Sequence, residues 1–162
     1  MSKYEAGFLG AGNMGGALAA AAARQVTGER VAVSCSTPAH SAAAAERLGC
    51  RAAAPEEILR ESRFVFLGVK PQMLDGVVQS LSAPVAASEG VFVSMLAGVQ
   101  LEWLERTLGA DKKIIRIADL LTHTSGLPPY APTSELEKQY GSPSPDGMIE
   151  YIANCRRDFK PQ

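Results

Sequence analysis

The stretch that decides the fold is AGFLGAGNMGG, residues 6–16. A short apolar run, residues 7–9, is followed by three glycines in G-x-G-x-x-G spacing and then by an alanine-rich helical segment, residues 17–24. This order is typical of a dinucleotide-binding turn: the first glycine permits a tight turn, the second lets the backbone approach a pyrophosphate, and the third lets helix and strand pack closely. The phosphates would bind the free N–H groups at the helix N-terminus. We predict a cofactor site at Gly10, Gly12, Asn13, Met14 and Gly15; the alternative is a plain tight turn that binds nothing.

Downstream of this turn, apolar runs alternate with helix-like segments. Strands are expected at residues 31–35, 51–53, 64–69, 91–95 and 113–117, and helices at 37–48, from 55, at 72–81 and at 101–108. Strands that alternate with helices at this spacing indicate right-handed βαβ units. We predict an α/β fold over residues 1–117: a Rossmann-like, doubly wound, mostly parallel sheet of five or six strands.

The character of the chain changes after residue 117. Residues 118–162 hold six of the ten prolines but only three alanines. This composition predicts a turn-rich, partly helical C-terminal extension, with one helix from residue 144. We place a domain boundary near residue 117 and expect the extension to be poorly anchored.

Composition bounds the partners of the protein. The 162 residues carry 16 basic and 17 acidic side chains, a net charge of −1, so neither nucleic acid nor an anionic membrane surface is expected as a partner. We see no signal peptide and no apolar run of the roughly 18 residues that a membrane helix needs. The cysteines, Cys35, Cys50 and Cys155, lack metal-ligand spacing, so we expect no metal, reduced thiols and a cytoplasmic protein.

The end of the second predicted strand bears on the choice of cofactor. A dinucleotide fold usually places an acid here for the ribose 2′-hydroxyl, but residues 34–37 read SCST and hold no carboxylate. Small hydroxyls at a helix N-terminus would accept a 2′-phosphate that an acid would repel. We therefore predict NADP rather than NAD, with Ser36 and Thr37 as ligands. The alternative is that both residues only cap the following helix.

Two later strand ends are candidates for the same site. Val69, Lys70 and Pro71 close the apolar run FVFLGV, at the edge where open α/β sheets bind ligands. Lys70 either lines the cofactor or is a solvated charge. Ala97 and Gly98, after the next strand, are small enough to let a nicotinamide approach, although small residues also suit any tight turn.

Residues 7–117 resemble the N-terminal half of the pyrroline-5-carboxylate reductase family, which makes proline. The matching stretches are GFLGAGNMG (7–15), FLGVKPQ (66–72), SMLAGV (94–99) and IIRI (114–117). The resemblance implies hydride transfer from NAD(P)H to a cyclic imine. The family normally continues MPNTP after the last stretch, whereas this chain reads ADLL, and the family's dimerisation domain, which completes the substrate pocket, has no match. Two functions stay open: an NADPH-dependent reductase of this type, and a catalytically silent NADP-binding fragment or fusion remnant. We assign neither a catalytic residue nor an oligomeric state.

A second resemblance begins just beyond the predicted boundary. Residues 119–128, DLLTHTSGLP, look like a segment of the serine β-lactamase and esterase family. The chain holds no S-x-x-K motif, and His123 and Ser125 are not part of a G-x-S-x-G elbow. The chain thus resembles a fusion of two fragments, and we expect no serine-hydrolase chemistry.

Overall fold

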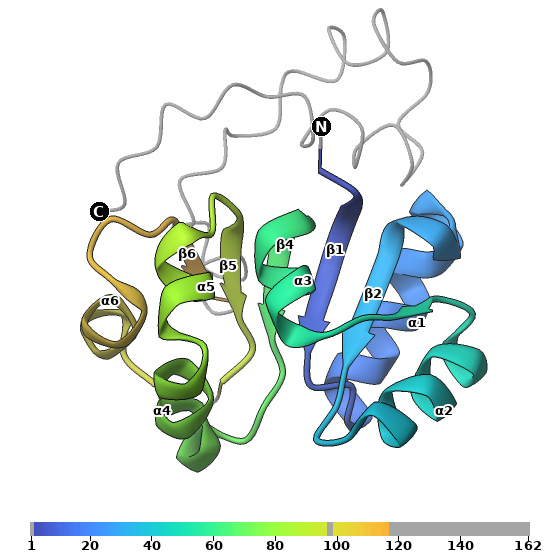
Figure 1. The fold of residues 1–162 in the computed structure, drawn as a ribbon, viewed down its shortest axis with the longest axis horizontal. Coiled ribbons are helices and arrows are strands. Elements are labelled where there is room, and N and C mark those ends of the chain that lie inside the picture. Colours follow the sequence, from blue (N-terminus) through green and yellow to red (C-terminus); the bar gives the residue numbers. More distant parts are fainter. Residues whose placement is uncertain (1, 97–98, 117–162) are drawn as a thin grey trace, which may run out of the picture. The chain divides into compact units, whose positions relative to one another are not determined.

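The computed structural model describes residues 2–96 and 99–116, which form a parallel sheet covered by helices (Figure 1). In chain order the elements are β1 (Tyr4–Leu9), α1 (Asn13–Val26), a 3-10 turn η1 (Gly28–Arg30), β2 (Val31–Ser34), α2 (Pro38–Leu48), β3 (Arg51–Ala52), α3 (Pro55–Glu61), β4 (Ser62–Leu67), α4 (Pro71–Ser80), α5 (Ser82–Ala87), β5 (Val91–Ser94), α6 (Leu101–Leu108) and β6 (Ile114–Arg116). No helix in these two ranges is both long and apolar enough to cross a membrane.

Strand β1 lies near the centre of the sheet. It pairs with β2 on one side and β4 on the other, so that Gly7 lies opposite Ala32 and Val65. The strand order is β3-β2-β1-β4-β5-β6, and all five pairs among the described strands are parallel. This is the order of dinucleotide-binding doubly wound sheets, in which ligands bind outside the carboxyl ends of the strands where the order reverses, here between β1 and β4. The Rossmann-like fold predicted from the sequence is confirmed.

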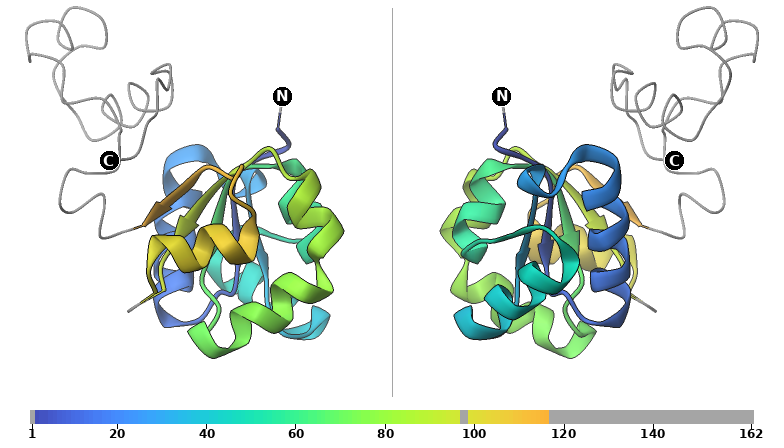
Figure 2. Two further views of the ribbon diagram at one scale, coloured as in Figure 1. Left: turned by 90° about the vertical axis from the view of Figure 1, so that its left-hand side faces the viewer. Right: turned by 90° about the vertical axis from the view of Figure 1, so that its right-hand side faces the viewer.

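Each face of the sheet has its own hydrophobic cluster. Helices α1 and α2 cover one face, where Ala19 and Ala44 pack with Phe8 and Val33. Helices α3 to α6 and the α4–α5 junction cover the other face and contribute larger side chains: Ile58, Leu59, Leu74, Val78, Leu81, Val85, Leu104 and Leu108. Figure 2, which views the molecule from two sides, shows helices on either side of the strands. Helices α1 and α2 contribute mainly alanine to their cluster, and the short connections from β1 and β2 place their first turns next to the ends of these strands.

Several element boundaries differ from the sequence predictions, most of them by a single residue, and the larger differences are at α1, β4 and α5. Helix α1 begins at Asn13, before the alanine run, and β4 spans Ser62–Leu67 rather than 64–69. Strand β4 ends early because Gly68 turns against the backbone of Gly10, although its N–H still donates to the carbonyl of Leu9 at 2.8 Å. Helix α5 was not predicted; it holds Pro84 in its first turn, where a proline removes no hydrogen bond of the helix.

The remaining fold predictions concern the C-terminal part of the chain. The boundary near residue 117, the extension over 118–162 and its helix from residue 144 lie outside the described residues. The division into two domains therefore stays a prediction.

Candidate functional site

The turn between β1 and α1 is tightened by contact between two glycines. Gly10 has a positive φ of 99°, a conformation that side chains disfavour, and its N–H donates to the carbonyl of Ser34 at 2.8 Å. A Cβ on Gly10 would lie 2.6 Å from the carbonyl oxygen of Gly68, at the end of β4. The ends of β1, β2 and β4 therefore meet at this residue, and no larger residue fits there.

The other two glycines of the turn have opposite surroundings. Gly15 is buried, and a Cβ there would meet the backbone of Gly10 and lie 3.6 Å from the Cε of Met95. Gly12 is exposed, and a Cβ there would meet no atom within 4 Å. Gly15 is thus required for packing, whereas the protein itself does not require a glycine at position 12. The open space lies where the motif would receive a phosphate.

The first turn of α1 provides an environment that favours an anion. Gly12 is its N-cap residue, no side chain caps the helix, and the first turn contains no acidic residue. The Gly16 N–H bonds to the Gly12 carbonyl at 2.7 Å, which leaves the N–H groups ahead of it without a partner inside the helix. Asn13 and Met14 are exposed in this turn, Met14 to 62%. Free N–H groups and the helix dipole act together on any negative charge placed here.

The end of β2 separates the roles of the two predicted hydroxyl residues. Thr37 is the N-cap of α2, where its Oγ1 accepts the N–H of His40 at 3.2 Å. Ser36 is exposed, with its Oγ 3.4 Å from His40 Nδ1. The neighbouring Cys35 N–H donates to the Oγ of Ser41 at 2.8 Å. The capping alternative thus describes Thr37, while the Ser36 hydroxyl remains accessible from solvent.

Of the three residues predicted at the end of β4, one lines the cavity at this end of the sheet, which the next paragraph describes. Val69 lines that cavity. Lys70 is the exposed N-cap of α4 and Pro71 is its first residue, and neither lines the cavity. Ala97 and Gly98 lie outside the described residues.

A cavity of about 900 Å³ extends along the carboxyl edge of the sheet, from α2 past the glycine turn to α4. Four predicted residues line it: Gly10, Gly12, Ser36 and Val69. The volume is within the range of small-molecule and cofactor pockets. Asn13, Met14, Gly15 and Thr37 do not line the cavity, although all four belong to the turns that border it.

The cavity also contains residues that sequence reasoning missed. Arg47 and His40 from α2, Glu56 from α3 and Met73 from α4 all line it. One signal was present in the sequence: positions 40, 43, 44 and 47 share one face of a helix, because side chains three, four and seven residues apart lie on the same side. Glu56 carried no such signal, because its place depends on how α3 crosses the end of the sheet.

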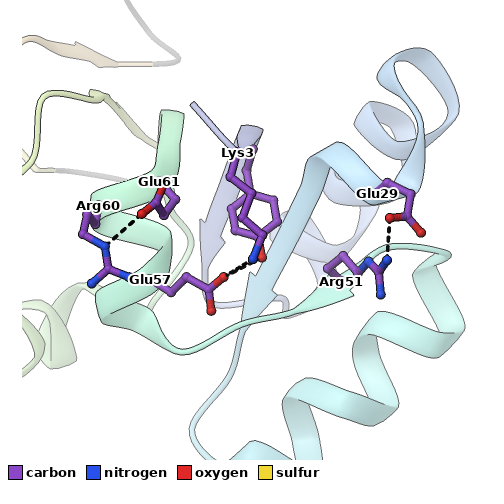
Figure 3. Close-up of polar contacts among 7 residues, drawn as sticks. Lys3, Glu29, Arg51, Glu57, Arg60 and Glu61 are labelled. Carbon is purple, nitrogen blue, oxygen red and sulfur yellow. Dashed lines mark hydrogen bonds and ion pairs between the residues drawn. The ribbon is translucent and has the colours of Figure 1, made fainter. Parts of the chain in front are cut away.

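Charged networks occur at the opposite edge of the sheet, at the start of β1. Lys3 Nζ and Tyr4 OH both donate to Glu57 Oε1, at 2.6 and 2.8 Å, and these two bonds hold the pKa of the Glu57 carboxyl below its usual value (Figure 3). The pairs Arg51–Glu29 and Arg60–Glu61 are also on the surface. None of these residues lines the cavity, so the networks are structural. In residues 2–96 and 99–116 no group of three or more His, Cys, Asp or Glu side chains could hold a metal ion.

Two family models match the chain. The model described as NADP oxidoreductase coenzyme F420-dependent matches residues 5–98, and the β-lactamase model matches residues 72–162. In the overlap the structure has α4, α5 and β5, which belong to the parallel sheet and its covering helices.

Individual relatives agree with the first of these matches. Pyrroline-5-carboxylate reductase 3 of Macaca fascicularis and pyrroline-5-carboxylate reductase of Escherichia coli K12 are each 34% identical over 68% of this chain, covering 41% and 42% of their own lengths. The solved 1-pyrroline-5-carboxylate reductase of Streptococcus pyogenes is 27% identical over 68% of this chain and 40% of its own, with a TM-score of 0.58. The Plasmodium falciparum enzyme, solved with NADP bound, is 22% identical over 72% of this chain and 42% of its own, with a TM-score of 0.55.

The chain spans about two fifths of the length of these relatives, and the matched part contains both the sheet and the glycine turn. The resemblance to pyrroline-5-carboxylate reductase found in the sequence is thereby confirmed for this part. Since the first model covers more than half of the 162 residues, the chain belongs to the NADP oxidoreductase coenzyme F420-dependent family through residues 5–98, and its residues 72–162 match the β-lactamase family in addition.

Proposed function

We propose that the protein binds NADP(H) at the carboxyl edge of its sheet and is the cofactor half of a reductase of the pyrroline-5-carboxylate type. The observation that carries the proposal is the open space at Gly12, beside an uncapped helix N-terminus and a cavity of about 900 Å³. Gly10 and Gly15 are needed for packing, but the chain itself gives no packing reason for a glycine at position 12. A cofactor phosphate supplies that reason.

The preference for NADP over NAD rests on the wall formed by β2. Ser34, Cys35 and Ser36 line the cavity there without a carboxylate, and Ser36 keeps an accessible hydroxyl. Glu56 also faces the cavity, but from α3. If the Ser36 hydroxyl donates a hydrogen bond to the 2′-phosphate, NADPH binds more tightly than NADH. Equal affinity for the two would remove this part of the proposal.

Ligand-induced stabilisation tests the cofactor site. A ligand that binds only the folded state raises the melting temperature, so NADPH at about 100 times its Kd should stabilise the protein by about 2.7 kcal/mol. Gly12→Leu should abolish the shift, because its side chain enters the space that the phosphate needs. Gly76→Leu is the matched control: Gly76 also has nothing within 4 Å of a Cβ, but it lies in α4 and does not line the cavity. An NADPH shift that survives in Gly12→Leu would refute the phosphate contact.

Reduction of the imine is the second half of the proposal. When bound at this edge, the dihydronicotinamide would supply a hydride to the imine carbon, and the imine nitrogen would take a proton from water. The chain contributes the binding and orientation of the cofactor, and we assign no catalytic side chain. The assay is oxidation of NADPH by pyrroline-5-carboxylate with the full chain.

A catalytically silent binding module is the second candidate. It is favoured by the second family match, because residues 72–162 match the β-lactamase family, as they would in a fusion of two fragments. Cofactor binding without turnover selects this candidate. We expect the cytoplasm as its compartment, where thiols stay reduced: Cys35 and Cys50 are free, and burial raises the pKa of the Cys50 thiol.

A further inference from the structure

Helix α2 forms one wall of the cavity with a single face. His40, Ala43, Ala44 and Arg47 all line the cavity, and their spacing places them on one side of the helix. The rotation of α2 is fixed at both ends, by the Thr37 cap and by a left-handed C-cap glycine that bonds back to the last turn. Two small residues and a guanidinium therefore face the ligand space.

Arg47 lies close to the start of α1. Its Nη2 is 3.9 Å from the place where a Cβ on Gly16 would lie, and Gly16 is itself bonded to Gly12. Gly16 and the alanines of α2 have little side-chain bulk, which makes room for the guanidinium between the two helices. Arg47 is exposed, and within residues 2–96 and 99–116 it forms no ion pair with a carboxylate.

We propose that Arg47 binds a phosphate group of the dinucleotide cofactor, as a second anchor beside the N-terminus of α1. The inference rests on the proposed function, because it needs the cofactor in this cavity. A guanidinium offers a planar set of donors that matches phosphate oxygens, and it stays charged at any physiological pH. Favourable interaction with the α2 dipole explains a cation in the last turn, but it does not require that cation to reach α1 and line the cavity.

Direct titration of the full chain with NADPH and with NADH tests the proposal. Arg47→Gln should weaken NADPH binding roughly tenfold, with a loss that shrinks at high salt, while Arg47→Lys should keep part of the affinity. Arg24→Gln is the matched control, because Arg24 is an exposed cation in the last turn of α1 that does not line the cavity. Both glutamine variants lose a favourable charge at a helix C-terminus, so only a cavity contact separates their affinities.

The two cofactors identify which phosphate is held. Loss of NADPH affinity alone assigns Arg47 to the 2′-phosphate, and equal loss for both cofactors assigns it to the pyrophosphate. Unchanged NADPH and NADH affinity in Arg47→Gln overturns the inference while the proposed function stands. If the unmodified chain binds neither cofactor, the proposed function and this inference both fail.

Discussion

Gly10→Ala tests whether the turn between β1 and α1 is packed as the structure has it. A residue other than glycine at a φ of 99° costs about 1–3 kcal/mol. The new Cβ would also lie 2.6, 2.7 and 2.9 Å from three backbone atoms of Gly68 and Val69, which have no rotamer to move away by. Overpacking of this kind adds roughly 1–3 kcal/mol, so we expect a total destabilisation of about 4 kcal/mol.

A loss of this size is readily measured. Domains of this size have a free energy of unfolding of about 5–15 kcal/mol, and about 4 °C of melting temperature is lost per kcal/mol. Gly10→Ala should therefore lower the midpoint of thermal unfolding, followed by circular dichroism, by roughly 15 °C. The same substitution two residues later, Gly12→Ala, is the control, because Gly12 has a φ of −69° and open space around its Cβ. Its expected cost is roughly 0.5–1 kcal/mol, because glycine is preferred over alanine at a helix N-cap.

The difference between the two variants carries the test. Both add one methyl group to the same turn, so a general intolerance of the turn would affect them alike. If the melting temperature of Gly10→Ala lies within about 3 °C of that of Gly12→Ala, the backbone of Gly10 does not approach Gly68 as closely as the structure has it.

Three further predictions concern the remaining parts of the chain. The pKa of the Glu57 carboxyl is lowered in the folded state, so this residue stabilises the fold above its unfolded pKa, and that stabilisation is lost as the pH falls below about 4.3. Glu57→Gln should therefore flatten the acid side of the profile of unfolding free energy against pH, measured by urea unfolding. An unchanged profile would show that the bonds from Lys3 and Tyr4 are not formed. Thr37→Ala should cost about 1 kcal/mol through loss of the cap on α2, whereas Thr37→Ser should keep most of it; equal costs in urea unfolding would contradict the capping bond. A β-lactam should leave the mass of the intact protein unchanged, because the S-x-x-K nucleophile motif is absent, and a covalent adduct would refute that reasoning.

The sheet could be predicted from the sequence because its signals are local. The apolar runs that became β1, β2, β4 and β5 are each bounded by a turn or a helix signal, and parallel strands buried on both faces need no alternation. The two-residue error at the end of β4 has a tertiary cause: Val69 continues the apolar run, but the contact of Gly68 with Gly10 ends the pairing. That contact joins positions far apart in the chain, so no local pattern contains it.

The candidate site was less predictable than the fold for the same reason. Gly10, Gly12 and Gly15 were assigned together from their spacing between a strand and a helix, and the structure separates them into packing residues and one open position. Arg47 and Glu56 reach the cavity only through the placement of α2 and α3, which depends on the strand order. The charged residues of the cavity are therefore set by long-range topology, whereas the glycine turn could be recognised from the local sequence.

Binding and turnover place different demands on this chain. Binding needs a phosphate site, and Gly10, Gly12 and Arg47 line one cavity beside the uncapped N-terminus of α1. Hydride transfer also needs a substrate held against the nicotinamide in a closed site, since misplacement by about 1 Å can cost a hundredfold in rate. Gly12→Leu and Arg47→Gln act on the first demand alone, so they should change cofactor affinity whether or not the protein turns over. Affinity is therefore the measurement that judges the site, and turnover is the measurement that judges the enzyme.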